Sequence, residues 1–368
     1  MSGEAGPSST GDGPASHAVT PLRTALIGYG VAGEVFHAPL LAAEPGLSLA
    51  TVVTGNEERA ARVRERYPGV GVLDAPEPLW ERPDEHDLVV VAAPNRAHVE
   101  LARAALGAGL HVVVDKPLAA RAEDGRELAR AADRAGRTLA VFQNRRYDGD
   151  FLTVRRLMKD GALGSVHRFE SRFERWRPQL REGAWRERGG PEEAGGLLYD
   201  LGSHLIDQAL VAFGPVRAVY AELDRQRPGA QADDDDFVAL HHGSGVRSHL
   251  WMSHAAGQAG PRMRVLGSSA AYVKWGLDPQ EDALRAGAAP GGEGWGTEPP
   301  ERWGLLGVDE STSAVPTEPG QYPRFYRELV EALRAGGPPP ATAGEAVATL
   351  ELIEAAMESA RSGAVVAA

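Results

Sequence analysis

The sequence predicts an α/β protein in two parts: a doubly wound parallel sheet first, then an open, mostly antiparallel sheet domain. Between residues 22 and 142, short apolar segments alternate with helical patterns, as in a parallel sheet built from βαβ units. After Tyr147 the strand patterns follow one another through short or turn-like connections, which indicates antiparallel pairing. A chain of 368 residues is long enough for two such domains.

The first part is predicted to be a dinucleotide-binding domain over residues 21–146. Residues 1–20 are rich in Gly, Ser, Pro and Ala and lack apolar periodicity, so a disordered tail is expected there. Strands are predicted at 24–27, 47–53, 88–92, 111–114 and 138–142. Helices are predicted from the glycines near residue 30 to Leu41, and at 57–66, 97–108 and 122–135.

The second part, residues 147–368, is predicted to hold the substrate and any oligomer contacts. It begins with a helix at 151–159. Strands are expected at 166–173, 216–223, 237–241, 246–252, 263–266 and 271–275. A helix over 200–207 falls between the first two strands, and a loop is expected over 287–320. Helices at 323–335 and 344–361 close the chain, separated by three prolines.

Composition narrows the class of protein. The formal net charge is −12, and no Lys/Arg cluster stands apart from neighbouring acids, so nucleic-acid binding is not expected. The absence of cysteine excludes disulfides and thiolate metal sites. No apolar run is long enough to cross a bilayer, and no basic-then-apolar signal pattern precedes the first strand. A cytoplasmic enzyme without membrane contact is expected.

A glycine-rich turn after the first strand predicts a dinucleotide site. Gly28 permits the tight turn, Gly30 allows the backbone to approach a pyrophosphate, and Gly33 permits close helix packing. The helix that follows stabilises the phosphate charge at its N-terminus. The predicted cofactor-binding segment is Gly28, Tyr29, Gly30, Val31, Ala32 and Gly33.

The end of the second strand bears on the choice between NADP and NAD. NAD enzymes usually place an acidic residue there to bind the adenosine ribose, whereas this chain has Thr54 and Asn56, without a carboxylate. Both side chains donate hydrogen bonds, and Arg59 or Arg62 adds positive charge. NADP is therefore favoured. NAD stays the alternative, with Glu57 or Glu58 in the acidic role.

Two motifs carry residues suited to alcohol and ketone chemistry. Asp115-Lys116-Pro117 follows the fourth strand, where ligands bind in open α/β sheets, and a lysine there stabilises developing alkoxide charge. Helical spacing would place Asp200, His204 and Asp207 on one face as carboxylate, imidazole and carboxylate. Such an imidazole is equipped for general acid/base catalysis.

Two other interpretations of the helix motif remain open. Its polar face could form a structural hydrogen-bond network, or it could hold a divalent metal. No H-x-x-x-H or H-E-x-x-H partner is present, so no metal site is predicted.

Taken in order, the motifs resemble those of the glucose–fructose oxidoreductase / inositol dehydrogenase (Gfo/Idh/MocA) family. They are G-x-G-x-x-G, P-x-x-x-H at 94–98, Asp-Lys-Pro, and D-x-x-x-H-x-x-D. Within that family the sequence is similar to bacterial NADP-dependent scyllo-inositol dehydrogenases, in segments that include Asn144-Arg145-Arg146, 199–204 and 280–287. The resemblance extends from about residue 22 to the end of the chain.

The resemblance implies a Rossmann domain, an open-sheet domain and an active site between them. It implies that Lys116, Asp200 and His204 form the catalytic set. It further implies a homodimer or homotetramer and a cyclitol or sugar substrate. The residues that it places beside the cofactor or the substrate are Pro94, Asn95, His98, Asp115, Lys116, Asn144, Arg145 and Tyr199.

Two positions depart from the family pattern. Asp115 replaces the usual Glu of Glu-Lys-Pro, and Asn56 stands where Arg is expected in close relatives. Three alternative functions share the predicted cofactor site: a keto-sugar reductase of secondary metabolism, a non-catalytic dinucleotide-binding sensor, and a lyase or hydrolase that uses tightly held NAD transiently.

Overall fold

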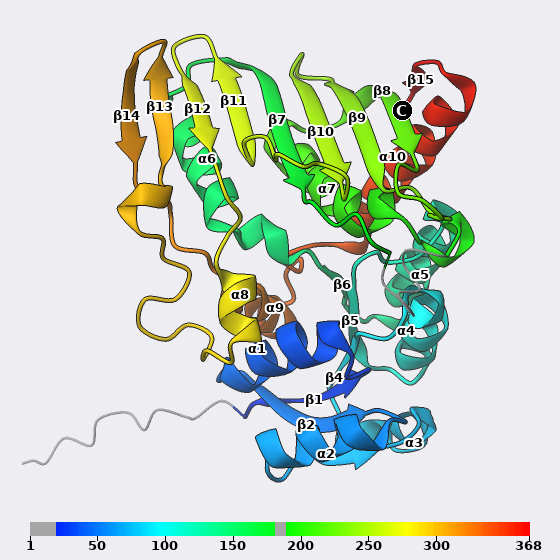
Figure 1. Cartoon of the computed structure of the whole chain (residues 1–368). Coiled ribbons are helices and arrows are strands. Elements are labelled where there is room, and N and C mark those ends of the chain that lie inside the picture. The colour runs from blue at the N-terminus through cyan, green and yellow to red at the C-terminus, as the bar shows by residue number, and fades with distance from the viewer. Residues whose placement is uncertain (1–19, 181–188) are drawn as a thin grey trace, which may run out of the picture.

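The computed structural model describes residues 20–180 and 189–368, so the tail predicted for residues 1–20 lies outside the described residues up to residue 19. Each half of the chain contributes one sheet, and the two sheets lie at opposite ends of the molecule (Figure 1). The predicted fold class is confirmed: a parallel, doubly wound sheet precedes a mostly antiparallel one.

The N-terminal sheet has six parallel strands in the order β3-β2-β1-β4-β5-β6. The strands are β1 (Leu22–Ile27), β2 (Leu47–Val53), β3 (Gly71–Leu73), β4 (Leu88–Val91), β5 (His111–Asp115) and β6 (Leu139–Phe142). Strands β1 to β3 are added toward one edge of the sheet and β4 to β6 toward the other, so the strand order reverses between β1 and β4. Open α/β sheets bind ligands at such a point, outside the carboxyl ends of the strands.

Helical segments connect these strands. They are the π-helix η1 (Ala32–His37), which continues into α1 (Ala38–Ala43), then α2 (Glu57–Arg66), α3 (Glu77–Glu81), α4 (His98–Gly107) and α5 (Ala122–Ala135), with 3-10 turns η2 (Pro83–Glu85) and η3 (Asn95–Ala97). The bounds of β2, α2 and α5 are those predicted. The short β3 and α3 were not predicted, because segments of three and five residues carry too little periodicity.

The C-terminal sheet has nine strands in the order β14-β13-β12-β11-β7-β10-β9-β8-β15. They are β7 (Val166–Glu174), β8 (Val216–Asp224), β9 (Asp235–His242), β10 (Arg247–Ser253), β11 (Met263–Gly267), β12 (Ala271–Lys274), β13 (Gly304–Val308), β14 (Ser311–Val315) and β15 (Val366–Ala367). Among the strand pairs of this sheet that the structure describes, only β7 and β10 pair in parallel. The hairpin β13–β14 corrects the expectation of a loop over 287–320; its largely exposed residues give no alternating apolar pattern.

Helices cover one face of this sheet (Figure 1). The helical segments of this half are η4 (Asn144–Tyr147), α6 (Gly149–Lys159), η6 (Pro191–Glu193), the π-helix η7 (Leu198–Gly202), α7 (Ser203–Phe213), α8 (Gln280–Arg285), η8 (Pro300–Arg302), α9 (Pro323–Ala335) and α10 (Ala343–Ser362). The last of these packs against α7 and β8 in its own half and against α5 and β6 in the other half. The C-terminal helix therefore ties the two halves together.

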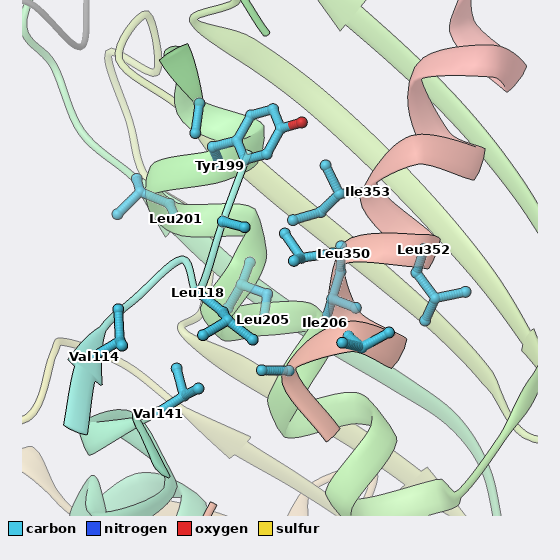
Figure 2. Close-up of a cluster of buried hydrophobic side chains, with 14 of the residues drawn as sticks. Val114, Leu118, Val141, Tyr199, Leu201, Leu205, Ile206, Leu350, Leu352 and Ile353 are labelled. Carbon is cyan, nitrogen blue, oxygen red and sulfur yellow. The ribbon is translucent and has the colours of Figure 1, made fainter. Parts of the chain in front are cut away.

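One hydrophobic cluster extends through both halves. Figure 2 shows its centre, where Leu205 and Ile206 of α7 face Leu350 of α10, with Val114 of β5 and Val141 of β6 on the adjoining side. All five side chains are at most 2 % exposed. The helix that carries the predicted acid/base residues is thus anchored on its apolar side against both sheets. No helix within residues 20–180 and 189–368 is long and apolar enough to cross a membrane.

Candidate functional site

A cavity of about 700 Å³ lies between the carboxyl edge of the parallel sheet and the helices under the second sheet. It brings together all three residues of the predicted catalytic set, Lys116, Asp200 and His204. The full lining is Val31, Ala32, Phe36, Asp115, Lys116, Phe142, Asn144, Arg145, Arg175, Arg177, Asp200, Leu201, His204, Leu277, Asp278, Glu281, Asp282 and Arg285.

The glycine turn forms the edge of this cavity and fits a dinucleotide. Gly28 has a φ of +97°, and a side chain there would strike the backbone of Ala92. At Gly33 a Cβ would overlap the carbonyl of Gly28. A Cβ at Gly30, by contrast, would meet only Arg59 Nη1, at 3.9 Å. Two glycines are therefore needed for packing, and the third leaves open space where a pyrophosphate could approach the backbone.

Lys116 is held at the end of β5 by the residues around it. The backbone N–H of Lys116 donates to Asp115 Oδ1 at 2.9 Å. Burial alone would raise the pKa of Asp115, but contact with His37 and the charge of Lys116 outweigh it, so the pKa is lowered. The His37 ring in turn contacts the Tyr326 hydroxyl at 2.6 Å. Asp115 thus stays ionised beside the lysine backbone.

Lys116 and Asp200 are joined across the cavity. Lys116 Nζ donates to Asp200 Oδ1 at 2.8 Å and to the Asp200 carbonyl at 2.5 Å. The lysine side chain is only 12 % exposed, whereas that of the aspartate is 32 % exposed. The pair connects the sheet edge of one half to the η7 turn of the other half. An ammonium fixed in this way presents its remaining N–H to the cavity.

His204 lies in the first turn of α7, one turn after Asp200. Its ring is 5 % exposed, and Nδ1 is buried without a hydrogen-bond partner among the described residues. Burial first, then the positive charges of Lys116 and Arg145, hold the pKa of His204 well below 6.5. The imidazole is therefore neutral at neutral pH, the form that accepts a proton.

Asp207 does not join this pair, which corrects the predicted alignment of carboxylate, imidazole and carboxylate. Its carboxylate accepts hydrogen bonds from Arg146 Nε and Nη2 at 2.8 and 2.6 Å, and it is 2 % exposed. The π-helical turn η7 changes the angular position of Asp200 relative to α7, whereas His204 and Asp207 both lie within α7, so the Asp207 carboxylate is placed by its contact with Arg146. Asp207 fixes α7 to the η4 turn instead.

Of the three remaining residues predicted to bind substrate, two line the cavity and one does not. Asn144 and Arg145 line the cavity, and Arg145 Nη2 donates to Glu281 Oε2 at 2.9 Å. Tyr199 does not line it: its ring points into the apolar cluster, as Figure 2 shows, and its hydroxyl donates to the Ala120 carbonyl at 2.7 Å. Tyr199 therefore fixes the η7 turn through the apolar cluster and the Ala120 carbonyl, and not through the cavity.

The predicted residues after β4 are not among those that line the cavity. His98 is fully buried, and its ring nitrogens contact the carbonyl oxygens of Pro117 and Ala93 at 2.8 and 2.9 Å. Asn95 Nδ2 donates to the Ala194 carbonyl at 3.2 Å, and Pro94 precedes it as the N-cap of η3. The His98–Pro117 contact fixes the loop after β5, which carries Lys116.

The end of β2 carries the groups that bear on cofactor choice. Thr54 is buried, and the Asn56 side chain caps α2 by accepting from the Arg59 N–H at 2.9 Å. Arg62 is paired with Glu34 at 2.7 Å. No ion pair is found for the Arg59 side chain within the described residues, and its guanidinium lies next to Gly30. Tyr29 is buried, so it contributes backbone to the turn.

Several lining residues were not predicted. Arg175 and Arg177 follow β7, and their spacing of two residues on extended backbone places both on one face. That period was visible in the sequence, but nothing in it showed which face meets the cavity. The side chains of α8, including Glu281, Asp282 and Arg285, belong to a helix of six residues that the sequence pattern did not reveal. Within the part of the chain described, no three His, Asp or Glu side chains are grouped to hold a metal ion.

Comparison with known protein families gives two matches that together span most of the chain. Residues 22–143 match the oxidoreductase family with an NAD-binding Rossmann fold, and residues 155–368 match the C-terminal alpha/beta domain of the same family. The chain belongs to the Gfo/Idh/MocA oxidoreductase family. It is therefore an NAD(P)-binding oxidoreductase.

Individual family members match over nearly their whole length. The chain is 43 % identical to the uncharacterized oxidoreductase YdgJ of Escherichia coli, covering 92 % of this chain and 96 % of that protein. It is 38 % identical to the scyllo-inositol 2-dehydrogenase (NADP⁺) IolW of Bacillus subtilis, covering 93 % and 95 %. The structure of the oxidoreductase YvaA from Bacillus subtilis superposes with a TM-score of 0.90 at 37 % identity, covering 95 % of this chain and 99 % of that one.

Proposed function

We propose that this member of the family is an NADP-dependent dehydrogenase or reductase that transfers a hydride between the nicotinamide and a hydroxyl or keto carbon of a cyclitol or sugar. The observation that carries the proposal is the Lys116–Asp200 pair beside neutral His204, in one cavity with the edge of the glycine turn. The similarity to IolW, whose name gives scyllo-inositol and NADP⁺, supports the substrate class and the cofactor.

His204 is assigned the proton transfer. In the oxidative direction, the neutral imidazole accepts the hydroxyl proton, and a nicotinamide cofactor held at the glycine turn would supply the hydride acceptor. Burial and the charges of Lys116 and Arg145 keep this imidazole unprotonated at neutral pH, so the base is ready without prior loss of a proton. In the reductive direction the same ring must first be protonated, and its low pKa makes that form a strong acid toward the new alkoxide.

Lys116 and Asp200 are assigned the role of binding the substrate at its reacting oxygen. The ammonium stabilises negative charge on that oxygen as the carbon becomes a ketone or an alcohol. Asp200 holds the ammonium in place through two contacts, and its partly exposed carboxylate accepts a hydrogen bond from a neighbouring hydroxyl. A polyol with adjacent hydroxyls satisfies both groups, which favours a cyclitol or sugar over a simple alcohol.

The preference for NADP rests on the end of β2. No carboxylate stands there to bind a free ribose hydroxyl and to repel a 2′-phosphate. Thr54, Asn56 and Arg59 supply donors and positive charge in that region, and no ion pair of Arg59 is found among the described residues. We assign Arg59 rather than Arg62 to the phosphate, because Arg62 is already paired with Glu34.

Initial rates test the proposal directly. NADP⁺ reduction is measured with scyllo-inositol and its stereoisomers, with NAD⁺ in parallel. Turnover that prefers NADP⁺ supports reaction and cofactor together, and turnover that prefers NAD⁺ overturns the cofactor assignment. NADPH binding without turnover of any cyclitol or keto-sugar would contradict catalysis and favour a dinucleotide-binding sensor.

A further inference from the structure

Among the charged side chains that line the cavity, Arg175 differs from its neighbours. Lys116 is paired with Asp200, and Arg145 and Arg285 both contact Glu281. No hydrogen bond or ion pair is found for the Arg175 guanidinium among the residues that the structure describes. Its backbone, in contrast, is fixed: the N–H donates to the Ser253 carbonyl at 2.8 Å.

The position of Arg175 costs free energy in the absence of a partner. The side chain is half-buried, and burial first, then the like charge of Arg177, lower the pKa of Arg175. Removing part of the hydration shell of a guanidinium is unfavourable unless an anion or strong acceptors replace the lost water. The Arg175 side chain is therefore stabilised most when an anion binds to it.

The acids of the cavity do not fill this role. Asp278 accepts from the N–H groups of Gly149 and Gln280, and Glu281 is held by two arginines. Asp282 is exposed on α8, which packs against η1 beside the glycine turn. The Arg175 guanidinium lies within electrostatic range of Glu281 and, more weakly, of Asp200, which contacts Lys116. Arg175 lines the same cavity as Lys116 and His204.

From this arrangement we infer that Arg175 binds an anionic substituent, a carboxylate or a phosphate, on the polyol substrate. The inference rests on the proposed function and makes it narrower: the preferred substrate is an acidic or phosphorylated polyol rather than a neutral one. The planar guanidinium suits either group, because it offers two parallel N–H donors to a pair of oxygens. Lys116 and His204 then act on a hydroxyl carbon of the same molecule.

Binding to the enzyme–NADPH complex tests the inference without requiring turnover. The probes are D-glucuronate for the carboxylate, D-glucose 6-phosphate for the phosphate and myo-inositol as the neutral polyol, with NADPH fluorescence as the signal. We expect at least one anionic probe to bind more tightly than myo-inositol. In Arg175→Gln the dissociation constant of that probe should rise about tenfold or more, the effect of losing a charge-assisted hydrogen bond, and Arg175→Lys should restore part of the affinity.

Arg264→Gln is the matched control, because it removes one positive charge from β11 outside the cavity lining. It should keep the wild-type ratio of anionic to neutral affinity. Equal loss in both Gln variants, or tighter binding of myo-inositol than of both anions, would overturn the inference. Turnover of neutral cyclitols together with that result would leave the proposed function standing, so the two failures are distinguishable.

Discussion

His204 is the side chain on which the proposed proton transfer depends. His204→Ala removes the base from a buried position in the cavity. Because general acid/base catalysis contributes about 10²–10⁴-fold, kcat should fall by a factor in that range. Cofactor affinity should change little, since the glycine turn is made by other residues. Steady-state rates and NADPH titration measure the two quantities separately.

The matched control for this variant is His241→Ala, on an exposed position of β9. Its kcat should equal that of the wild type. Full turnover in His204→Ala would remove the imidazole from the mechanism, and a parallel loss of NADPH binding would show that the variant damages the fold instead.

Arg59 and Arg62 allow a paired test of cofactor preference, since both lie on α2 but differ in their contacts. Arg59→Ala should raise the KM for NADP⁺ about tenfold with little effect on NAD⁺, because a charge-assisted phosphate contact is lost. Arg62→Ala breaks an exposed ion pair with Glu34, which solvent screens, so it should change the KM for NADP⁺ little. Equal effects of the two variants on NADP⁺ would contradict the assignment of Arg59.

The sequence was sufficient to predict which residue types meet at the site, but not all of their contacts. Lys116, Asp200 and His204 come from three different segments or turns, and their motifs indicated one active site before any geometry was known. Asp207 shows where such reasoning fails. Its helical spacing from His204 was correct, since both residues lie in α7, but the buried Arg146 decides where its carboxylate goes.

Within the glycine turn, Gly30 and Gly33 are expected to have different roles, Gly30 in cofactor binding and Gly33 in folding. A methyl group at Gly30 meets open space, so Gly30→Ala should fold normally and weaken NADPH binding by blocking the close approach of the pyrophosphate. A methyl group at Gly33 overlaps the Gly28 carbonyl. Gly33→Ala should therefore lower the free energy of unfolding by about 1–3 kcal/mol, as overpacking does. Urea unfolding and NADPH titration of both variants check this; an equally destabilised Gly30→Ala would contradict the separate roles.

Elements with strong periodicity were predictable, and short or irregular ones were not. The helix α5 has apolar residues at helical spacing and a glycine C-cap, so both of its ends could be read from the sequence. The helix α8 has six residues, of which only Gln280 and Leu284 are buried. Its contribution to the cavity comes from packing against η1, which involves segments about 245 residues apart and leaves no local pattern.

Across the whole molecule, the shared hydrophobic cluster fixes one half relative to the other. Residues of β5, α7 and α10 belong to the same buried cluster. Separating the halves would expose this apolar surface to water, at a free-energy cost of about 25 cal/mol per Å². The cavity walls come from both halves. The geometry that joins Lys116 to Asp200 is therefore a property of the complete fold, and global stability and the active site should respond together to changes in pH.

His204 connects the stability of the fold to the chemistry of the candidate site through its lowered pKa. As pH falls through about 6.5, the unfolded chain binds a proton at this histidine while the folded protein does not. Protonation then favours the unfolded state, so this residue lowers the free energy of unfolding by up to about 1.4 kcal/mol per pH unit below that point.

His204→Gln binds no proton in either state. Urea unfolding at pH 7, 6 and 5 should therefore show the variant gaining stability relative to the wild type as pH falls. Leu205→Ala, a packing change in the same helix, should shift stability by a constant amount at all three values. A difference between His204→Gln and wild type that does not vary with pH would mean that the imidazole is protonated equally in the folded and unfolded states, and the neutral base of the proposed mechanism would then have no support.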